Sequence, residues 1–280
     1  METQYIMETQ YLKLLHTLLT KGERRPTRSG MVYSMFGHTL DFDLSQSFPL
    51  LTTKKMYFKG VVEELAWFLR GSTDVSELRD KGVHIWDGNT EKREYDAGPV
   101  YGFQWRHFGA PYTGCKKDYK GKGQDQIKRV IELLKLNPTS RRILLSGWNP
   151  QQQHEMALPP CHVSYQFYVD SENKLHCQMY QRSADVFLGL PFNIASTALL
   201  THLLAHECKR EVGTMRIIIG DAHLYEDHAG VAALQIQRVP HAPPTLSIER
   251  ERDGLWGVKM SEIKVHGYKC HDRLKAKMAV

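Results

Sequence analysis

Long apolar runs are missing from this 280-residue chain. No stretch approaches the roughly 18 consecutive apolar residues that a membrane-spanning helix needs, and no apolar segment of the kind that forms a secretory signal opens the chain. We therefore expect a protein without a membrane anchor, located in the cytoplasm. A nuclear or organellar location stays open, because the sequence holds no feature that separates these compartments.

Cysteine is also sparse. The chain has five cysteines, an odd number, and no two of them form a CxxC pair. This pattern argues against a disulfide framework and against a structural zinc site. Two histidines at helical spacing, His202 and His206, lack an acidic third ligand at suitable spacing. We therefore expect no metal.

Clustered basic runs are absent as well. The formal net charge is +6, but the lysines are scattered along the sequence. Nucleic-acid-binding domains usually gather their basic residues on one face or one segment, so RNA binding stays open without support. A modest positive charge suits a small anionic ligand.

Helical and strand-like patterns follow one another without a low-complexity linker, which predicts an α+β fold in a single domain over residues 1–280. Residues 1–10 are expected to form a flexible extension, 112–123 a surface insertion, and 239–267 irregular structure. From the periodicity of apolar residues, helices are expected over 11–19, 59–70, 124–136 and 194–208 and after residue 225, and strands over 143–148, 163–169, 175–179 and 215–219.

Two of these strands carry no charge on their polar faces. In 163–169 and 175–179 the alternating polar positions hold only neutral side chains. A sheet face in contact with water normally carries charges, so we expect this face to be covered. Another subunit or a helix of the same chain could cover it.

Cys161 has the most informative surroundings in the sequence. Pro159 and Pro160 fix the backbone before it, His162 follows it, and Arg182 returns near it one hairpin later. Nearby cations lower a thiol pKa and favour the nucleophilic thiolate. The alternative is a buried structural cysteine, which is the usual state of an unpaired cysteine.

Three further features each have a functional and a structural explanation. Glu64 lies in an apolar helix, where a carboxylate must be ion-paired, hydrogen-bonded or protonated. Asn193 precedes a helix, and either caps it or reads a base edge with its amide. The adjacent arginines Arg141 and Arg142 are either solvated or bind phosphate, and Arg182 at a strand end needs an anionic partner.

Taken together, these residues resemble the thymidylate synthase family over nearly the whole chain. The resemblance rests on many separated blocks in the same order. The matching blocks are 48–54, 64–69, 85–87, 98–102, 140–143, 156–162, 181–196 and 278–280. It implies a large mixed β-sheet covered by helices on one face, with the other face forming a homodimer interface.

The resemblance also implies an activity and its catalytic residues. The family methylates deoxyuridine monophosphate (dUMP) reductively to dTMP, with 5,10-methylenetetrahydrofolate as donor of carbon and hydride. Cys161 would attack C6 of the uracil, Glu64 would organise protons around O4, and Tyr101 would help to remove the C5 proton. Asn193 would read the uracil edge, and Asp185 would bind the pterin ring.

Substrate-binding residues are implied in the same way. Arg182 and Ser183 would hold the phosphate together with Arg141 and Arg142 of the other subunit. His223 and Tyr225, two residues apart, would bind the deoxyribose hydroxyl. Residues on the folate side would be Trp86, Leu158, Leu188, Gly189, Phe192, Ala279 and Val280.

The sequence departs from the family pattern at two places that concern the site. Arg28 fills the place of a fourth phosphate arginine if one residue is deleted before Phe36, and Arg25 is the alternative. The segment 270–273 lacks the usual Pro-His-Pro. Two other functions stay open: a pyrimidine deoxynucleotide hydroxymethylase with the same covalent chemistry, and a non-catalytic nucleotide- or RNA-binding homologue.

Overall fold

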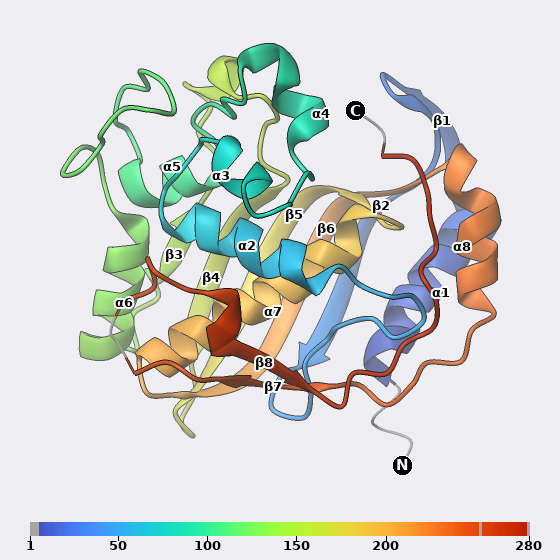
Figure 1. The fold of residues 1–280 in the computed structure, drawn as a ribbon. Helices are drawn as coiled ribbons and strands as arrows, with labels where there is room; N and C mark the ends of the chain where they lie inside the picture. Colours follow the sequence, from blue (N-terminus) through green and yellow to red (C-terminus); the bar gives the residue numbers. More distant parts are fainter. Residues whose placement is uncertain (1–5, 252–253, 279–280) are drawn as a thin grey trace.

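The computed structural model describes residues 6–251 and 254–278. The main strands are β1 (Glu23–Thr27), β2 (Gly30–Asp43), β3 (Leu144–Ser146), β4 (His162–Val169), β5 (Lys174–Asp185) and β6 (Glu211–Tyr225). They form one six-stranded sheet in the order β1-β2-β6-β5-β4-β3 (Figure 1). β5 and β6 are parallel and the other neighbours are antiparallel, so the sheet is mixed, as predicted.

Helices lie over one face of this sheet (Figure 1). The helices are α1 (Ile6–Lys21), α2 (Phe58–Leu69), α3 (Ser76–Arg79), α4 (Asp87–Thr90), α5 (Tyr101–His107), α6 (Gln126–Leu136), α7 (Gly189–Glu207) and α8 (Ala229–Ile236). The described residues also form single-turn 3₁₀ helices, which are η2 (Glu91–Arg93), η3 (Gln153–Glu155), η4 (Glu226–His228) and η5 (Met260–Glu262). α7 packs on β5 and β6 and also on α2, which explains why it is apolar around most of its circumference.

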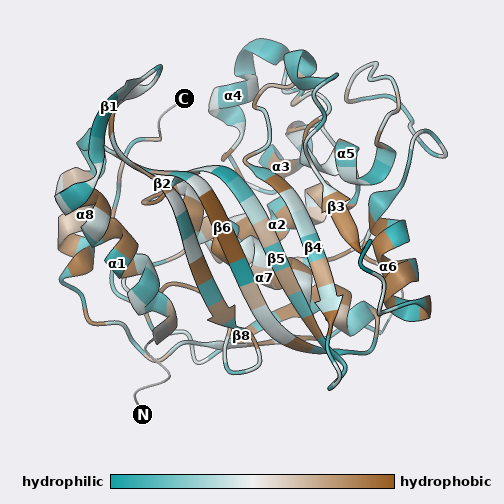
Figure 2. Ribbon diagram, turned by 180° about the vertical axis from the view of Figure 1, so that it is seen from behind, coloured by the Kyte–Doolittle hydropathy of each residue, from teal (hydrophilic) through white to brown (hydrophobic). Residues whose placement is uncertain are grey.

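The opposite face of the sheet is bare (Figure 2). No helix of the described chain lies over it. Leu144, Tyr168 and Tyr180 are exposed by 50%, 65% and 39%, and Gln166 and Gln178 are exposed as well. The explanation that a helix of the same chain covers the uncharged strands is therefore wrong for the described residues.

All predicted helices and strands are present, although α7, β5 and β6 are longer than expected. The strands β1 and β2 were not predicted. The segment 239–267, expected to be irregular, contains a two-stranded sheet of β7 (Thr245–Ile248) and β8 (Ile263–His266). In both cases the segments are strands because they pair with a neighbouring strand, which the local sequence does not indicate.

Residues 6–10 also differ from the expectation of a flexible extension, because they belong to α1. The Glu8 carboxylate accepts hydrogen bonds from the backbone N–H and the hydroxyl of both Thr52 and Thr53, at 2.6–2.8 Å. The start of α1 is thereby fastened to the segment before α2. Residues 1–5 lie outside the described residues.

Residues 112–123 form a loop without helix or strand. The rings of Tyr112 and Tyr119 stack on each other and pack against Phe103. This small apolar cluster holds the loop against α5. Its description as a surface insertion stays a prediction.

Candidate active site

The predicted site residues gather where several elements begin or end. Cys161 directly precedes β4, and His162 pairs with Gln181 of β5. Because β5 and β6 are parallel, their last residues lie at the same end of the sheet, where Asp185 pairs with His223. The topology thus brings the ends of three strands together.

Cys161 is held from both sides. Its backbone N–H donates to the Tyr101 hydroxyl at 2.8 Å, and its carbonyl accepts from the Arg182 N–H at 2.9 Å. The Arg182 guanidinium donates to the carbonyls of Pro159 and Pro160 at 2.8 and 2.9 Å. The two prolines therefore stiffen the approach to Cys161 and also provide the acceptors that place the cation beside it.

The electrostatic balance at Cys161 differs from the expectation. Burial raises the pKa of the thiol, and the nearby Arg182 cation and the Tyr101 hydroxyl offset this only in part. The prediction that the surroundings favour the thiolate is therefore wrong for the protein alone, because desolvation penalises the charged form. His162 does not act as a base for it: its Nδ1 lies 2.8 Å from the Tyr165 hydroxyl, and burial lowers its pKa to about 4.

Glu64 is a half-buried acid without a cation among the described residues. Its carboxylate accepts a hydrogen bond from the Trp86 indole at 2.8 Å, and no ion pair to it exists among the described residues. Burial raises the pKa of Glu64 to about 7, although the Trp86 hydrogen bond opposes the shift. The structural explanation, an ion pair, is therefore wrong for the described residues, and the role of Glu64 as an acid and base stays a prediction. The neighbouring Glu63 carries the ion pair instead, with Lys81 at 2.5 Å.

Asn193 lies inside the first turns of α7 and does not cap the helix, because the N-cap position belongs to Leu188. Its Oδ1 accepts from Gln181 Nε2 at 2.8 Å, and the same nitrogen donates to the Ser183 carbonyl at 3.0 Å. The N-cap explanation is therefore wrong, and the amide is oriented by a buried glutamine. Gln181 is only weakly indicated by the sequence, as a neutral polar residue at a core-facing strand position.

Asp185 ends β5 and receives two backbone donors. Its Oδ1 accepts from the N–H groups of Phe187 and Leu188 at 3.0 and 3.1 Å. Lys54 donates to the Phe187 carbonyl and lies 3.9 Å from the centre of its ring. Burial lowers the pKa of Lys54 to about 7. Lys54 belongs to a matching sequence block, but no role was predicted for it.

His223 and Tyr225 lie together near the end of β6, with their rings 5.4 Å apart. His223 Nδ1 is 3.2 Å from the Asp221 carboxylate, which also pairs with Arg25 at 3.7 Å. Arg28 lies exposed in the turn between β1 and β2, and its charge acts on Tyr225. Arg24 and Arg25 of this hairpin pair with Glu226 and Asp221, whereas no ion pair to Arg28 is found in the described part of the chain. The choice of Arg28 over Arg25 as a phosphate ligand stays a prediction.

Arg141 and Arg142 are not brought to Cys161. They are exposed just before β3, whose Leu144 pairs with Gln166 in β4. At about 3.3 Å per residue along a strand, this register places both arginines roughly 20 Å from the start of β4. The expectation that the other subunit supplies them is compatible with this distance and stays a prediction.

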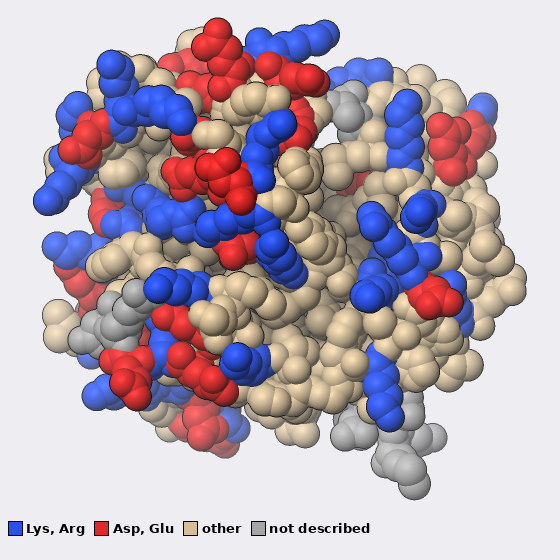
Figure 3. Space-filling model, viewed as in Figure 1, with Lys and Arg blue, Asp and Glu red and all other residues tan. Residues whose placement is uncertain are grey.

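The residues predicted for the folate side come from several elements. Figure 3 shows the surface hollowed between α4 and the end of the described chain. Trp86 directly precedes α4 and is buried, whereas Leu158, Leu188 and Phe192 are half-buried against the core. Gly189 opens α7 next to Asp185. Ala279 and Val280 lie outside the described residues.

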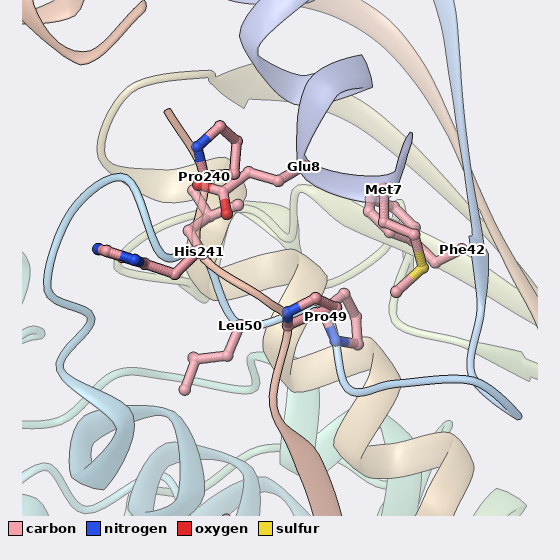
Figure 4. A pocket seen from close by; sticks show the side chains of 9 residues that line it. Met7, Glu8, Phe42, Pro49, Leu50, Pro240 and His241 are labelled. Carbon is pink, nitrogen blue, oxygen red and sulfur yellow. The ribbon is translucent and has the colours of Figure 1, made fainter. Parts of the chain in front are cut away.

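A separate cavity of about 20 Å³ is lined by Met7, Glu8, Phe42, Leu50 and His241, among others (Figure 4). It has room for about one water molecule, and no predicted site residue lines it. Among the described residues there is no group of three or more metal-ligating side chains, and no helix long and apolar enough to cross a membrane.

Comparisons with known proteins agree with this geometry. The sequence profile of the family described as thymidylate synthase matches residues 9–280. The chain is 50% identical to a bifunctional dihydrofolate reductase-thymidylate synthase of Paramecium tetraurelia, over 98% of this chain and 61% of that protein. It is 47% identical to the protein of that name from Zea mays, covering 54% of it, and 46% identical to a probable thymidylate synthase of Schizosaccharomyces pombe, covering 47%.

The chain thus spans about half the length of the curated relatives it matches. The match within that half is nearly complete, because it covers 98% of this chain in each case. The chain belongs to the thymidylate synthase family.

Proposed function

We propose that this chain catalyses the reductive methylation of dUMP to dTMP, with 5,10-methylenetetrahydrofolate as co-substrate and dihydrofolate as second product. The observation that carries the proposal is Cys161, fixed between the Tyr101 hydroxyl and the Arg182 backbone. A nucleophile held this rigidly, with a half-buried acid and an oriented amide nearby, suits covalent catalysis on a planar base.

Cys161 adds through its sulfur to C6 of the uracil, and the electron pair of the C5–C6 bond moves toward C5 and O4. The adduct makes C5 nucleophilic. Because burial favours the neutral thiol in the protein alone, the S–H proton leaves as the sulfur adds, and a proton is taken up at O4 as the electron pair reaches it. The Arg182 cation beside Cys161 is the nearest group that lowers the pKa of the thiol.

Glu64 and Tyr101 transfer protons during the reaction. A carboxyl whose pKa lies at about 7 exchanges a proton readily at neutral pH, which suits the charge that develops at O4. The Tyr101 oxygen already accepts from Cys161 N–H, so its own proton is free to point into the site. Burial keeps the pKa of Tyr101 well above its ordinary value, and the residue therefore relays protons as a neutral hydroxyl.

Asn193 selects the base. Its Oδ1 is fixed by the Gln181 donor, and a carbonyl oxygen has a second lone pair for uracil N3–H. The amide nitrogen then faces O4. Cytosine presents the opposite pattern of donor and acceptor at these positions.

The folate residues fit a pterin. When bound, methylenetetrahydrofolate supplies the one-carbon unit and the hydride. Asp185 would hold the ring: both of its backbone donors go to Oδ1, which leaves Oδ2 to accept from an amino group. Trp86, Leu188 and Phe192 would exclude water on this side, and Ala279 would cover it.

A homodimer completes the site. The bare sheet face exposes Leu144, Tyr168 and Tyr180, which are side chains typical of an interface core. Arg141 and Arg142, exposed and remote from Cys161 of their own chain, would bind the phosphate in the partner's site together with that subunit's Arg182, Ser183 and Arg28.

The experiment is a product assay. The protein is incubated with dUMP and methylenetetrahydrofolate, nucleotides are separated by chromatography, and dihydrofolate is followed by absorbance. The proposal predicts dTMP and dihydrofolate in equal amounts. Hydroxymethylated nucleotide without dihydrofolate would instead show a hydroxymethylase, and tight dUMP binding without any product would show a non-catalytic homologue.

A further inference from the structure

His228 lies between Tyr225, on the nucleotide side of the site, and Lys277, near the end of the chain. It lies in η4, three residues after Tyr225, and is followed at once by α8. Its side chain is buried, with an exposed fraction of 2%. No role was predicted for it from the sequence.

The polar contact of His228 goes to the C-terminal segment 271–278, called the tail here. Nε2 lies 2.8 Å from the Lys277 carbonyl oxygen. A carbonyl only accepts, so Nε2 must carry the proton. Nδ1 is buried and has no hydrogen-bond partner among the described residues. The tail is therefore the polar partner that fixes this ring.

The ring of His228 also touches both sides of the proposed site. It packs against Tyr225 with the ring centres 5.5 Å apart, and against Phe187 at 5.6 Å. Tyr225 belongs to the predicted deoxyribose contact. Phe187 donates its N–H to Asp185 and carries Lys54 on its ring, so it belongs to the folate side.

The tail is fastened earlier at one other place. The His271 N–H donates to the Thr52 carbonyl at 2.8 Å, and Arg238 donates to the Asp272 carbonyl at 2.8 Å. From there the chain runs alongside α8 toward the hollow (Figures 1 and 3). The bond from His228 holds Lys277, the residue just before 278–280.

We propose that His228 is a positioning residue that holds the tail against Tyr225 and Phe187, so that Lys277 and Met278 are kept at the folate side of the site. The inference rests on the proposed function, because it assigns the tail its place in that reaction. His228 touches no reacting atom itself. Its bond to Lys277 ties the placement of the tail to the two side chains that border nucleotide and folate.

The test compares two substitutions. His228→Phe keeps a flat ring between Tyr225 and Phe187 but removes the donor. His228→Gln places an N–H donor near the position of Nε2. For His228→Phe we expect the KM for methylenetetrahydrofolate to rise about 3- to 10-fold, the range for loss of one hydrogen bond, with the Kd for dUMP alone within about twofold of wild type. His228→Gln should recover most of the loss.

A second readout does not need activity. Trypsin cuts after Lys277 faster when the backbone of the tail leaves its place, so release of residues 278–280 from the full chain, followed by mass spectrometry, should be about 3- to 10-fold faster in His228→Phe. The matched control is His271→Phe, which removes the side-chain bond to the Val239 carbonyl at the start of the tail. We expect its cleavage at Lys277 to change less than about twofold.

Unchanged KM and unchanged cleavage in His228→Phe would overturn the proposal. So would equal losses in both His228 variants together with weaker dUMP binding, because these would show a purely structural role. If the wild-type protein makes no dTMP, the proposed function fails, while the cleavage comparison still decides whether His228 holds the tail.

Discussion

At the scale of single residues, burial sets the chemistry of the site. It raises the pKa of Glu64 to about 7, lowers that of Lys54 to about 7, and keeps the Cys161 thiol neutral. In each group the larger cause is loss of water, and the nearby charges and hydrogen bonds act as corrections. Without a ligand, all three groups are therefore shifted toward their neutral forms.

Glu64 gives a prediction for stability against pH. Its folded pKa of about 7 lies above the ordinary value of 4.5, so between these values the folded protein holds a proton that the unfolded chain releases. Stability must therefore fall as pH rises through this window. Relative to wild type, Glu64→Gln should gain up to about 3 kcal/mol of unfolding free energy between pH 4.5 and 8, at about 1.4 kcal/mol per pKa unit. Urea unfolding at both pH values measures it.

The same variant should lose at least about 100-fold in kcat, the usual contribution of a proton-transferring group. Glu63→Gln is the matched control, since it removes the ion pair with Lys81 on the same helix and should keep kcat within about twofold. A stability curve with the same pH slope in wild type and Glu64→Gln would refute the assignment of a raised pKa.

The candidate site was predictable in part. Cys161 stood out because of the prolines and cations around it, Glu64 because it is a carboxylate in an apolar helix, and Asn193 because it precedes a helix. Gln181, Lys54 and Asp221 were missed, since their roles depend on contacts between segments far apart in sequence. The direction of the Cys161 pKa was also wrong: the sequence shows the cation nearby but not the depth of burial.

At the scale of elements, α2 and α5 depend on a close backbone approach. Gly102 of α5 lies against the backbone of Phe68 in α2, and a Cβ atom there would come within 2.7 Å of the Phe68 carbonyl oxygen. This contact places Tyr101, the residue before Gly102, beside Cys161. The helix pair is thereby part of the site as well as of the core.

Gly102→Ala should therefore destabilise the protein by about 1–3 kcal/mol, as overpacking does, and lower kcat by displacing Tyr101. Gly230→Ala in α8 is the control: no atom lies within 4 Å of its Cβ position, and alanine favours the helix by about 0.5–1 kcal/mol. Thermal unfolding and steady-state kinetics measure both effects. Equal stability of the two variants would contradict the close packing.

The elements missed from the sequence share a cause. β1 is fully exposed and contains two adjacent arginines and a proline, which is a composition typical of a loop. It is a strand because Glu23–Thr27 pair with residues 30–34 of β2. Long apolar helices such as α2 and α7 were predicted well, since their pattern alone decides their structure.

At the scale of the whole molecule, one chain does not complete the proposed site. Arg141 and Arg142 lie at the other end of the sheet from Cys161, and the sheet face near them is bare. The uncharged strands indicated from the sequence that this face is covered. Only the structure shows that the described chain has no helix to cover it.

Mixing two inactive variants tests the shared site. The double variant Arg141→Ala/Arg142→Ala keeps Cys161, and Cys161→Ala keeps both arginines, so a mixed dimer holds one complete site. After subunit exchange in equal amounts, activity should return to about a quarter of wild type, because half of the dimers are mixed and one of their two sites is complete. No recovery, with mixed dimers shown by mass spectrometry, would contradict the sharing of arginines.

The central claim is that Cys161 is the nucleophile of a site that makes dTMP. The measurement is dTMP formation by Cys161→Ala, with dUMP binding followed by calorimetry and Cys115→Ala as the control cysteine. The account predicts a loss of turnover of at least about 1,000-fold, as expected for removal of a nucleophile, with dUMP still bound and with Cys115→Ala fully active. Formation of dTMP by Cys161→Ala at the wild-type rate would contradict it.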